Sequence, residues 1–357
     1  MELFPAAYHP PGSTPGTLAK PDQTKEFEIT LIDFSQTEFI QKKDISALEC
    51  KQYLESDNAT WIHVQGTPSD STLKQLGEVF GLHILHLEDI SNDVQRPKLD
   101  ALEQQAFLIL SLPIEIQGEI VVRQVSLFLF GRFIISICKG EKNPFDLIVD
   151  RIQKGNGKMR RRKSDYLFYA LIDCVIDHGF PVLESFVDRI DAIESELIQN
   201  PDEGLLTKIH ATRREIILLR RRLWPHRDVL NDVLNEIDAD LISNETRVYL
   251  KSCYENANSV MDLLETYREM AVGMLEVYVS SSSQRINKTM RFLTVITTLF
   301  IPPTFIVGVY GMNFNPQAGP LSMPELNSPY GYLSVWLLIL VTVVSLITFF
   351  IRRKWLK

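Results

Sequence analysis

The residues with the clearest chemical potential stand near the C-terminus, in the short sequence Tyr310-Gly311-Met312-Asn313-Phe314. The amide of Asn313 presents a carbonyl oxygen, and several copies of it around one axis would form a ring of neutral oxygens. Such a ring suits a hard divalent cation that keeps most of its water, since Mg²⁺ dehydrates reluctantly. Gly311 would let the backbone turn and approach closely. Alternatively, Gly-Met-Asn simply ends a helix, because Gly and Asn favour that position.

Two apolar runs must position this sequence, at 292–310 and 332–351, and neither contains a charged residue. Each is long enough to cross a bilayer as a helix, which takes about 20 apolar residues. Lys and Arg precede the first run and follow the second, whereas the loop 311–331 carries Glu325 as its single charged residue. By the positive-inside rule, we expect a multi-pass protein of the cell's inner (plasma) membrane. Both termini would be cytoplasmic and the loop external.

The first run also offers a face that could line an aqueous path. Seven residues, among them three threonines, recur every three or four positions, and threonines in a bilayer can satisfy their hydroxyls by bonding back to their own helix. One pair of spans cannot enclose a path, so several copies about a closed axis would be required. The same stripe could equally serve close helix packing. Its members are Asn287, Met290, Thr294, Thr297, Ile301, Thr304 and Gly308.

Composition argues against several classes of function. The formal net charge of −8 argues against nucleic acid as a partner. The four cysteines are scattered without a C-x-x-C pair, which suits a reducing cytoplasm and argues against a zinc knuckle. The sequence has no P-loop, no G-x-S-x-G elbow and no H-E-x-x-H motif, so we expect neither an enzyme nor use of ATP, and no organic cofactor.

The N-terminal part of the chain has two segments of different character. Residues 1–25 are rich in proline and are expected to form a disordered tail. Residues 26–160 mix strand and helix signals, which predicts a cytoplasmic α/β domain with a mostly antiparallel sheet. A two-residue hairpin turn is expected at Gly131-Arg132. The expected strands are 29–34, 62–64, 107–112, 121–130 and 133–138, and the expected helices are 71–80 and 84–90.

From residue 161 onward, helical signals replace strand signals. An apolar stripe predicts a helix at 165–199, and a second helix at about 203–236 would return antiparallel to it. A third helix would begin with Asn244 as its N-cap and continue to about 311, a length on the order of 100 Å. A helix of that length usually bundles with copies of itself. The expected segments are a helix hairpin at 161–240, a stalk helix at 241–291, a membrane region at 292–351 and a basic cytoplasmic tail at 352–357.

From about residue 26 onward, the sequence resembles the CorA family of divalent-cation channels. That family carries Gly-Met-Asn at the end of the first of two C-terminal spans, which is the context of Asn313 here. The loop between Phe314 and Met323 is longer than in the family pattern. Further stretches that resemble the family are Leu87-Glu88-Asp89-Ile90, Gln95-Arg96-Pro97-Lys98, Asp165-Tyr166-Leu167, Leu223-Trp224-Pro225, Tyr278-Val279-Ser280 and Met323-Pro324-Glu325-Leu326.

The resemblance implies a funnel-shaped homopentamer, in which an α/β/α domain carries long helices and two C-terminal transmembrane helices. It implies passive influx of Mg²⁺, with Co²⁺ and Ni²⁺ also accepted. Gly311, Met312 and Asn313 would form the outer selectivity filter, and Glu325 would belong to the external loop. Along the pore the resemblance places Asn287, Met290, Leu293, Ile301, Thr304 and Gly308, with Met290 and Leu293 at a hydrophobic gate.

The resemblance also implies that cytosolic Mg²⁺ binds between subunits and closes the channel. Glu88 and Asp89 match the carboxylates that the α/β domain contributes in relatives. Asp173 is a candidate for a further carboxylate near the ion, with Asp177 one helical turn later. Alternatively, these are ordinary acidic residues at helix ends.

The chain departs from the family pattern on the stalk helix. Where relatives carry an aspartate, this chain has Ser252, with Glu255 about one turn later. One carboxylate fewer predicts a weaker attraction for the divalent ion, or a site moved to Glu255.

Two other functions remain open at this point. The chain could be a Zn²⁺ transporter of the related zinc-transport branch, since His83 and His86 stand three residues apart and imidazoles bind zinc. It could also be a membrane-anchored scaffold that conducts nothing. A scaffold would explain the long helix and the anchor, but it would not explain a threonine stripe that ends at an amide.

Overall fold

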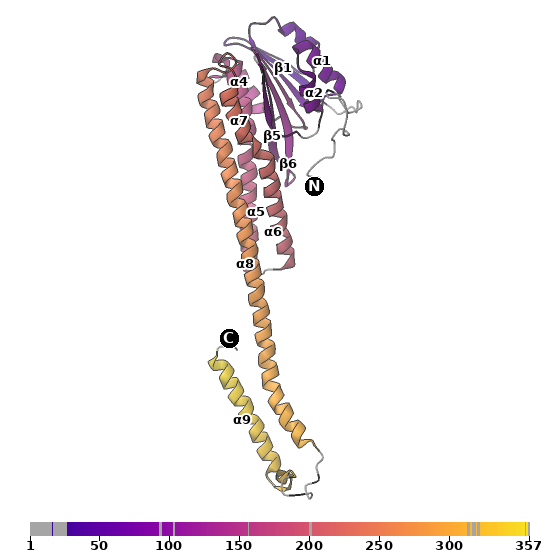
Figure 1. Cartoon of the computed structure of the whole chain (residues 1–357), viewed down its shortest axis with the longest axis vertical. Coiled ribbons are helices and arrows are strands. Elements are labelled where there is room, and N and C mark those ends of the chain that lie inside the picture. The colour runs from indigo at the N-terminus through magenta and orange to yellow at the C-terminus, as the bar shows by residue number, and fades with distance from the viewer. Residues whose placement is uncertain are drawn as a thin grey trace. The chain divides into compact units, whose positions relative to one another are not determined.

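The computed structural model describes residue 16 and residues 27–92, 95–102, 104–155, 157–199, 202–312, 315, 319, 322–353 and 355. The chain divides into two compact units, Met1–Met274 and Leu275–Lys357. The predicted tail 1–25 lies outside the described residues except for Gly16. Figure 1 labels several elements of each unit.

A seven-stranded mixed sheet forms the centre of the first unit, with strand order β2-β1-β3-β7-β6-β5-β4. The β3–β7 pair is parallel and the other neighbouring pairs are antiparallel, so the prediction of a mostly antiparallel sheet is confirmed. The strands are β1 (Phe27–Phe34), β2 (Phe39–Lys42), β3 (Ala59–Gly66), β4 (Lys98–Leu102), β5 (Gln105–Ile116), β6 (Glu119–Phe130) and β7 (Phe133–Cys138).

The predicted hairpin turn joins β6 to β7. Phe130 pairs with Phe133 across Gly131-Arg132, and Gly131 has φ +53°, a conformation that two-residue hairpin turns favour. The two edge strands, β2 and β4, were not predicted, because each is short and carries charged side chains that weaken the strand signal. Their pairing with β1 and β5 makes them strands.

Helices cover both faces of the sheet and give this unit three layers (Figure 1). On one face lie α1 (Asp70–Phe80), α2 (Ile84–Ser91) and the short η1 (Glu49–Tyr53). On the other lie α3 (Asp146–Gln153), α4 (Ser164–Asp177) and α7 (Pro225–Glu236). Each face has its own buried core, with Leu31, Ile62, Leu73 and Leu76 in the first and Trp61, Leu108, Phe145, Phe168 and Leu171 in the second.

Prolines divide two helices that the sequence analysis predicted as continuous. The segment 165–199 consists of α4 and α5 (Gly179–Gln199), separated at His178. Pro181 has no N–H to donate to the carbonyl of Asp177, which removes one bond of the ladder. The segment 203–236 consists of α6 (Glu203–Leu223) and α7, because Pro225 begins a new helix as its first residue.

The long helix α8 (Asn244–Tyr310) begins one residue after its cap. Asn244 was predicted as the N-cap, and this is wrong, because the Ser243 hydroxyl accepts the Thr246 N–H at 3.3 Å. The buried carboxylate of Asp165 in turn accepts the Ser243 N–H at 3.0 Å and its hydroxyl at 2.6 Å. The start of α8 is therefore tied to the start of α4.

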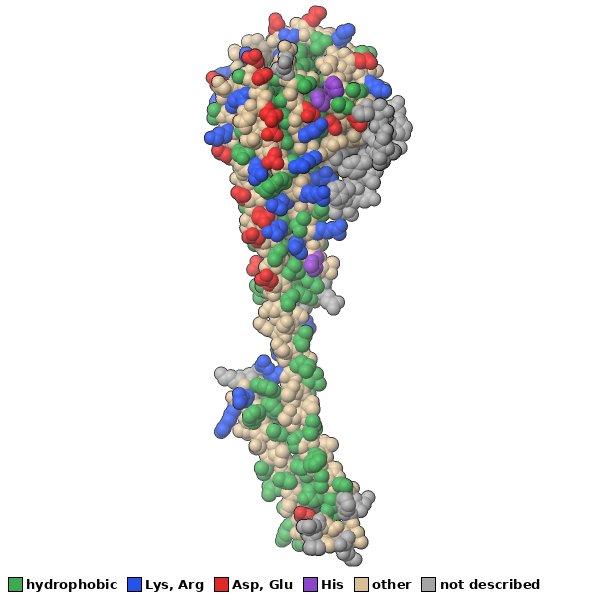
Figure 2. All heavy atoms as spheres, in the orientation of Figure 1, with side chains coloured by type: hydrophobic (Ala, Val, Ile, Leu, Met, Phe, Trp, Pro, Cys, Tyr) green, Lys and Arg blue, Asp and Glu red, His purple; other side chains and the backbone are tan. Residues whose placement is uncertain are grey.

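The second unit contains the C-terminal part of α8, the short η3 (Pro324–Asn327) and α9 (Gly331–Arg352). Among the described residues three helical stretches are long and apolar enough to cross a membrane, Ser164–Ile198, Asn244–Tyr310 and Gly331–Arg352. The apolar window of the first is 61% buried by the rest of the chain, whereas those of the other two are 6% buried. Figure 2 shows hydrophobic side chains over much of the visible face of this unit. Exposed apolar surface of this extent needs lipid or another protein to cover it.

Candidate functional site

The predicted pore stripe lies along the C-terminal part of α8. Its residues are three or four positions apart on one helix, so their side chains share one face. All of them are exposed in the single chain, and a shallow groove on this face is lined by Thr297, Phe300, Ile301, Thr304 and Phe305. The exposed members are Asn287, Met290, Thr294, Thr297, Ile301, Thr304 and Gly308, and the predicted gate residue Leu293 is exposed beside them.

Three threonines of this stripe bond back to their own helix. The hydroxyls of Thr294, Thr297 and Thr304 each donate to the carbonyl four residues earlier, at 2.8 Å. Each hydroxyl proton is thereby used within the helix, and the remaining lone pairs of the oxygen can only accept hydrogen bonds. The three threonines therefore offer hydrogen-bond acceptors on this face.

The Gly-Met-Asn sequence begins where α8 ends. The Gly311 N–H donates to the Val307 carbonyl at 2.9 Å, and the Met312 N–H donates to that of Val309 at 3.2 Å. A Cβ at position 311 would lie 3.2 Å from the Val307 oxygen, so glycine allows a close approach there. Asn313 lies outside the described residues.

Glu325 lies in η3, just before α9, and is exposed. A Cβ on Gly331 would lie 2.1 Å from the Glu325 carbonyl oxygen, a distance at which backbone has to move. Gly331 thus sets the position of the segment that carries Glu325. The sequence analysis did not identify Gly331, because a close approach of two backbone segments leaves no periodic signal.

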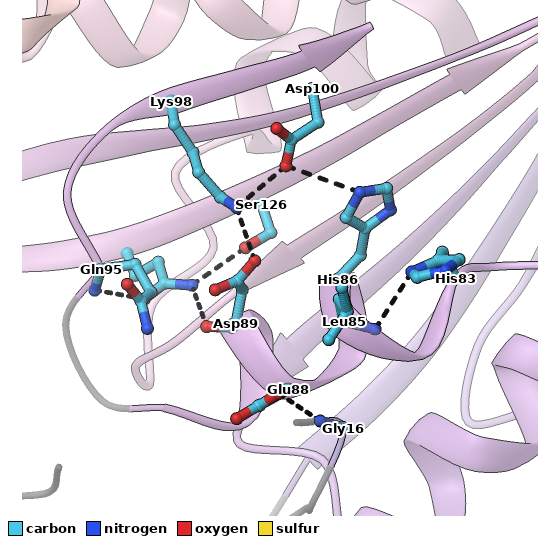
Figure 3. Close-up of polar contacts among 11 residues, drawn as sticks. Gly16, His83, Leu85, His86, Glu88, Asp89, Gln95, Lys98, Asp100 and Ser126 are labelled. Atoms are coloured by element: carbon cyan, nitrogen blue, oxygen red, sulfur yellow. Dashed lines mark hydrogen bonds and ion pairs between the residues drawn. The ribbon is translucent and has the colours of Figure 1, made fainter. Parts of the chain in front are cut away.

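Glu88 and Asp89 lie on α2 in the first unit, and Figure 3 shows their surroundings. The Glu88 carboxylate accepts the Gly16 N–H at 2.6 Å. The Asp89 carboxylate pairs with the Lys98 ammonium at 2.8 Å. The Asp89 backbone carbonyl accepts the amide of the buried Gln124 at 3.1 Å, which ties this end of α2 to β6.

Lys98 belongs to a cluster that sequence reasoning missed. Lys98 and Asp100 are two residues apart on β4, so they share a face of the sheet, and their side chains pair at 2.9 Å. His86 of α2 lies 3.5 Å from the Asp100 carboxylate and stacks on Phe107 with the ring centroids 4.3 Å apart. The charged residues at positions 98 and 100 could have predicted this cluster, because alternate residues of a strand share one face. That prediction would first have required β4 to be recognised as a strand.

The pKa values of two members of this cluster are shifted. Burial lowers the pKa of Lys98, but hydrogen bonds and charge from Asp89 and Asp100 outweigh it, so the net shift is upward. Lys98 therefore remains a cation. Burial lowers the pKa of His86 although the nearby Asp100 opposes this, so His86 is more readily neutral than an exposed histidine.

Asp173 and Asp177 lie one turn apart on α4. The Tyr169 hydroxyl donates to Asp173 at 3.2 Å, and the Asn256 amide of α8 donates to Asp177 at 3.4 Å. Burial raises the pKa of both carboxyl groups, and the charge of Asp177 raises that of Asp173 further. A divalent cation nearby would reverse these shifts, because it favours the ionised form.

On α8, Ser252 and Glu255 are exposed. Among the residues that the structure describes, no three His, Cys, Asp or Glu side chains gather in a way that could hold a metal ion. A single copy of the chain therefore does not bring the predicted regulatory residues Glu88, Asp89, Asp173, Asp177, Ser252 and Glu255 together as one set of ligands.

The predicted zinc pair is incomplete as well. The rings of His83 and His86 lie 5.6 Å apart, and the His83 Nδ1 accepts the Leu85 N–H at 3.3 Å as the cap of α2. Because Nδ1 of His83 accepts this hydrogen bond, only Nε2 of His83 could bind a metal. Two imidazoles are too few for a typical zinc site.

Comparisons with known proteins agree on one family. The family model described as "CorA-like Mg2+ transporter protein" matches residues 56–354. The chain is 35% identical to the cobalt/magnesium transport protein CorA of Thermotoga maritima, over 97% of each chain. It resembles the complete structure of the CorA magnesium transporter from Methanocaldococcus jannaschii with a TM-score of 0.75 and 21% identity, over 92% of this chain and 98% of that one. It is also 20% identical to the zinc transport protein ZntB of Pectobacterium atrosepticum, over 88% of this chain and 93% of that protein.

Proposed function

Since the chain belongs to the CorA-like family of divalent-cation transporters, we propose that it forms a homopentameric channel for passive Mg²⁺ influx, which also accepts Co²⁺ and Ni²⁺. One observation carries this proposal. A face with Asn287, three threonines and Gly308 runs along the exposed C-terminal part of α8 and leads to the Gly-Met-Asn sequence. Copies of this face around an axis would line a path, and Asn313, with Gly311 and Met312, would form the ring at its outer end.

The threonines suit a cation that keeps its water. Water molecules bound to Mg²⁺ point their hydrogens outward, so they need acceptors. Thr294, Thr297 and Thr304 have already used their hydroxyl protons within the helix and present lone pairs. Neutral oxygens would guide the hydrated ion without holding it as tightly as carboxylates do, which permits release.

In the proposed topology, both termini and the domains at 26–160 and 161–240 are cytoplasmic, and 311–331 with Glu325 is external. The stalk helix 241–291 leads into the membrane region 292–351, and 352–357 form a basic tail. No ATP is required, because a membrane potential of about 100 mV is worth about 4.6 kcal/mol to a divalent ion.

We further propose that cytosolic Mg²⁺ binds between neighbouring subunits and closes the path. Glu88 and Asp89 of one subunit would face the stalk of the next, with Asp173, Asp177, Ser252 and Glu255 as candidate partners. Because the described part of one copy gathers no three such side chains around a point, a metal site made of these residues would need a second copy to complete it. Ions that bind better to the closed arrangement favour it by reciprocal linkage.

The test is Mg²⁺ uptake by purified protein in vesicles that contain a Mg²⁺-sensitive dye. Asn313→Ala is expected to abolish uptake, whereas Asn315→Ala, the same change two residues later, is expected to retain it. Unchanged uptake in Asn313→Ala would contradict the proposed ring. A protein that conducts no divalent ion at all would support the scaffold alternative.

Zn²⁺ transport is the second candidate, because relatives include a protein named for zinc transport. Zn²⁺ would then compete with Mg²⁺ for uptake in the same vesicles. If the double variant His83→Gln/His86→Gln loses this competition, the result would favour Zn²⁺ transport. If low concentrations of Zn²⁺ do not reduce Mg²⁺ uptake by the unmodified protein, the result would contradict it.

A further inference from the structure

Lys98 holds the position next to Asp89 that a cation would occupy. Its ammonium lies 2.8 Å from the Asp89 carboxylate and 2.9 Å from that of Asp100 (Figure 3). The Lys98 side chain is 38% exposed and that of Asp89 is 19% exposed, so water screens the pair only in part. The Lys98 ammonium therefore already neutralises much of the negative charge with which Asp89 would attract a cation.

The fold keeps Lys98 in this place. Lys98 pairs with Ile109 and Asp100 with Phe107 in the β4–β5 register, which directs both side chains to the face that α2 covers. The Lys98 ammonium lies 5.9 Å from the centroid of the Phe107 ring, within the range of a cation–π contact. His86 lies 3.5 Å from Asp100 on the side away from Lys98. Asp100 thus acts as a positioning residue that shares the lysine with Asp89.

We propose that Lys98 is a built-in competitor that sets how much Mg²⁺ the regulatory site needs. An ion approaching Asp89 must share the carboxylate with a lysine or displace it towards Asp100. Asp100 makes displacement easier, because it offers Lys98 an alternative partner. This inference rests on the proposed role of Asp89, and it assigns to Lys98 a function that lowers the affinity of the site.

The experiment uses the full chain and measures the Mg²⁺ concentration at half-closure. Closure is followed by dye flux in vesicles, and protection of the protein in detergent from a protease gives a second measure. Lys98→Met is expected to lower the half-closure concentration about fivefold, the upper end for a partly exposed ion pair. Lys98→Arg, which keeps the charge, is expected to stay within about twofold of the unmodified protein.

Lys74→Met is the matched control, because it removes the same charge from an exposed position on α1. It is expected to leave the half-closure concentration unchanged. If Lys98→Met does not fold, Lys98→Gln retains a polar side chain and is expected to give the same shift. An equal shift in Lys74→Met would overturn the proposal, because the effect would then be one of net charge.

Asp100→Asn separates competition from a structural role. With its alternative partner removed, Lys98 would pair more fully with Asp89, and the half-closure concentration would rise. In the Lys98→Met background the same Asp100→Asn change would have a clearly smaller effect, because the lysine through which it acts is gone. Equal effects in both backgrounds would overturn this part of the proposal.

Asp89→Asn distinguishes failure of this inference from failure of the proposed function. If Asp89→Asn raises the half-closure concentration and Lys98→Met does not move it, Asp89 is part of the sensor and the role given to Lys98 is wrong. If Asp89→Asn has no effect, the proposed sensor lies elsewhere, which overturns both.

Discussion

Replacing His226 with glutamine should make the folded protein less sensitive to acid. His226 follows the Leu223-Trp224-Pro225 sequence on α7 and is 5% exposed. Its Nε2 accepts the N–H of Ser111 in β5 at 2.9 Å, so the neutral ring holds its proton on Nδ1. This bond joins the helical layer to β5 at Ser111, just beyond Ile109, which pairs with Lys98 at the start of β4.

The expected size follows from proton linkage. Burial lowers the pKa of His226 to about 3, whereas a histidine in the unfolded chain titrates near 6.5. Between pH 3 and pH 6.5 the unfolded chain binds a proton at this histidine, whereas the folded protein does not. Because the pKa is depressed in the folded state, the free energy of unfolding falls as the pH falls, by about 1.4 kcal/mol per pH unit. From pH 6.5, where the unfolded histidine is half protonated, to pH 4.5 this one residue accounts for about 2.3 kcal/mol.

The assay compares the pH dependence of stability in His226→Gln and in the unmodified protein. Urea unfolding is followed by pulsed hydrogen exchange at a fixed pulse pH, read on peptides from β5 and β6. Glutamine cannot take up the proton, and its amide oxygen can still accept from Ser111. The loss of stability between pH 6.5 and pH 4.5 is therefore expected to be about 2.3 kcal/mol smaller in the variant.

His210→Gln is the matched control, since His210 is exposed on α6. It is expected to keep the pH dependence of the unmodified protein. An identical pH dependence in His226→Gln would refute the reasoning, because it would mean that the folded protein protonates this site. His63 provides a second test of the same reasoning, because burial lowers its pKa to about 4. His63→Gln is therefore expected to reduce the loss of stability between pH 6.5 and pH 4.5 by a similar amount.

Three further outcomes are expected. Asp165→Ala removes the carboxylate that accepts the N–H and the hydroxyl of Ser243 and so ties the start of α8 to α4, and the free energy of unfolding in urea should therefore fall by about 1–3 kcal/mol. Gly331→Ala should reduce Mg²⁺ flux into vesicles severalfold without loss of folded protein, because the added Cβ displaces the backbone at Glu325. Thr304→Val should lower Mg²⁺ flux with unchanged helix content, whereas Thr342→Val on α9, which removes an equivalent 2.8 Å bond to the helix backbone, should leave the flux unchanged.

Strong local patterns made much of the fold predictable from the sequence. Strands β5, β6 and β7 are rich in β-branched and aromatic residues, and Gly131 supplies the positive φ of the turn between two of them. The errors arose where one residue decides a boundary. Pro225 begins α7 within a segment that was predicted as one helix, and Ser243 caps α8 because Asp165, far away in sequence, holds it in place. A one-dimensional pattern does not contain that second kind of contact.

The candidate sites likewise include one that the sequence pattern predicts and one that depends on contacts between distant segments. The stripe on α8 was predictable, because its residues follow the helical period and one helix positions them all. The surroundings of Asp89 were not, because they depend on which residues of β4 face α2. That register follows from pairing between β4 and β5, and a short edge strand carries too weak a signal to predict it.

The inference about Lys98 also predicts the shape of the response to Mg²⁺. In the proposed pentamer the steepness of closure depends on the number of sites and on the ratio of affinities in the closed and open states. Lys98 contacts Asp89 within one subunit, so it should weaken binding in both states by the same factor. Lys98→Met should then move the closure curve along the concentration axis without changing its steepness. A curve that becomes shallower or steeper would mean that the Lys98–Asp89 pair differs between the two states, which would make it part of the closing movement.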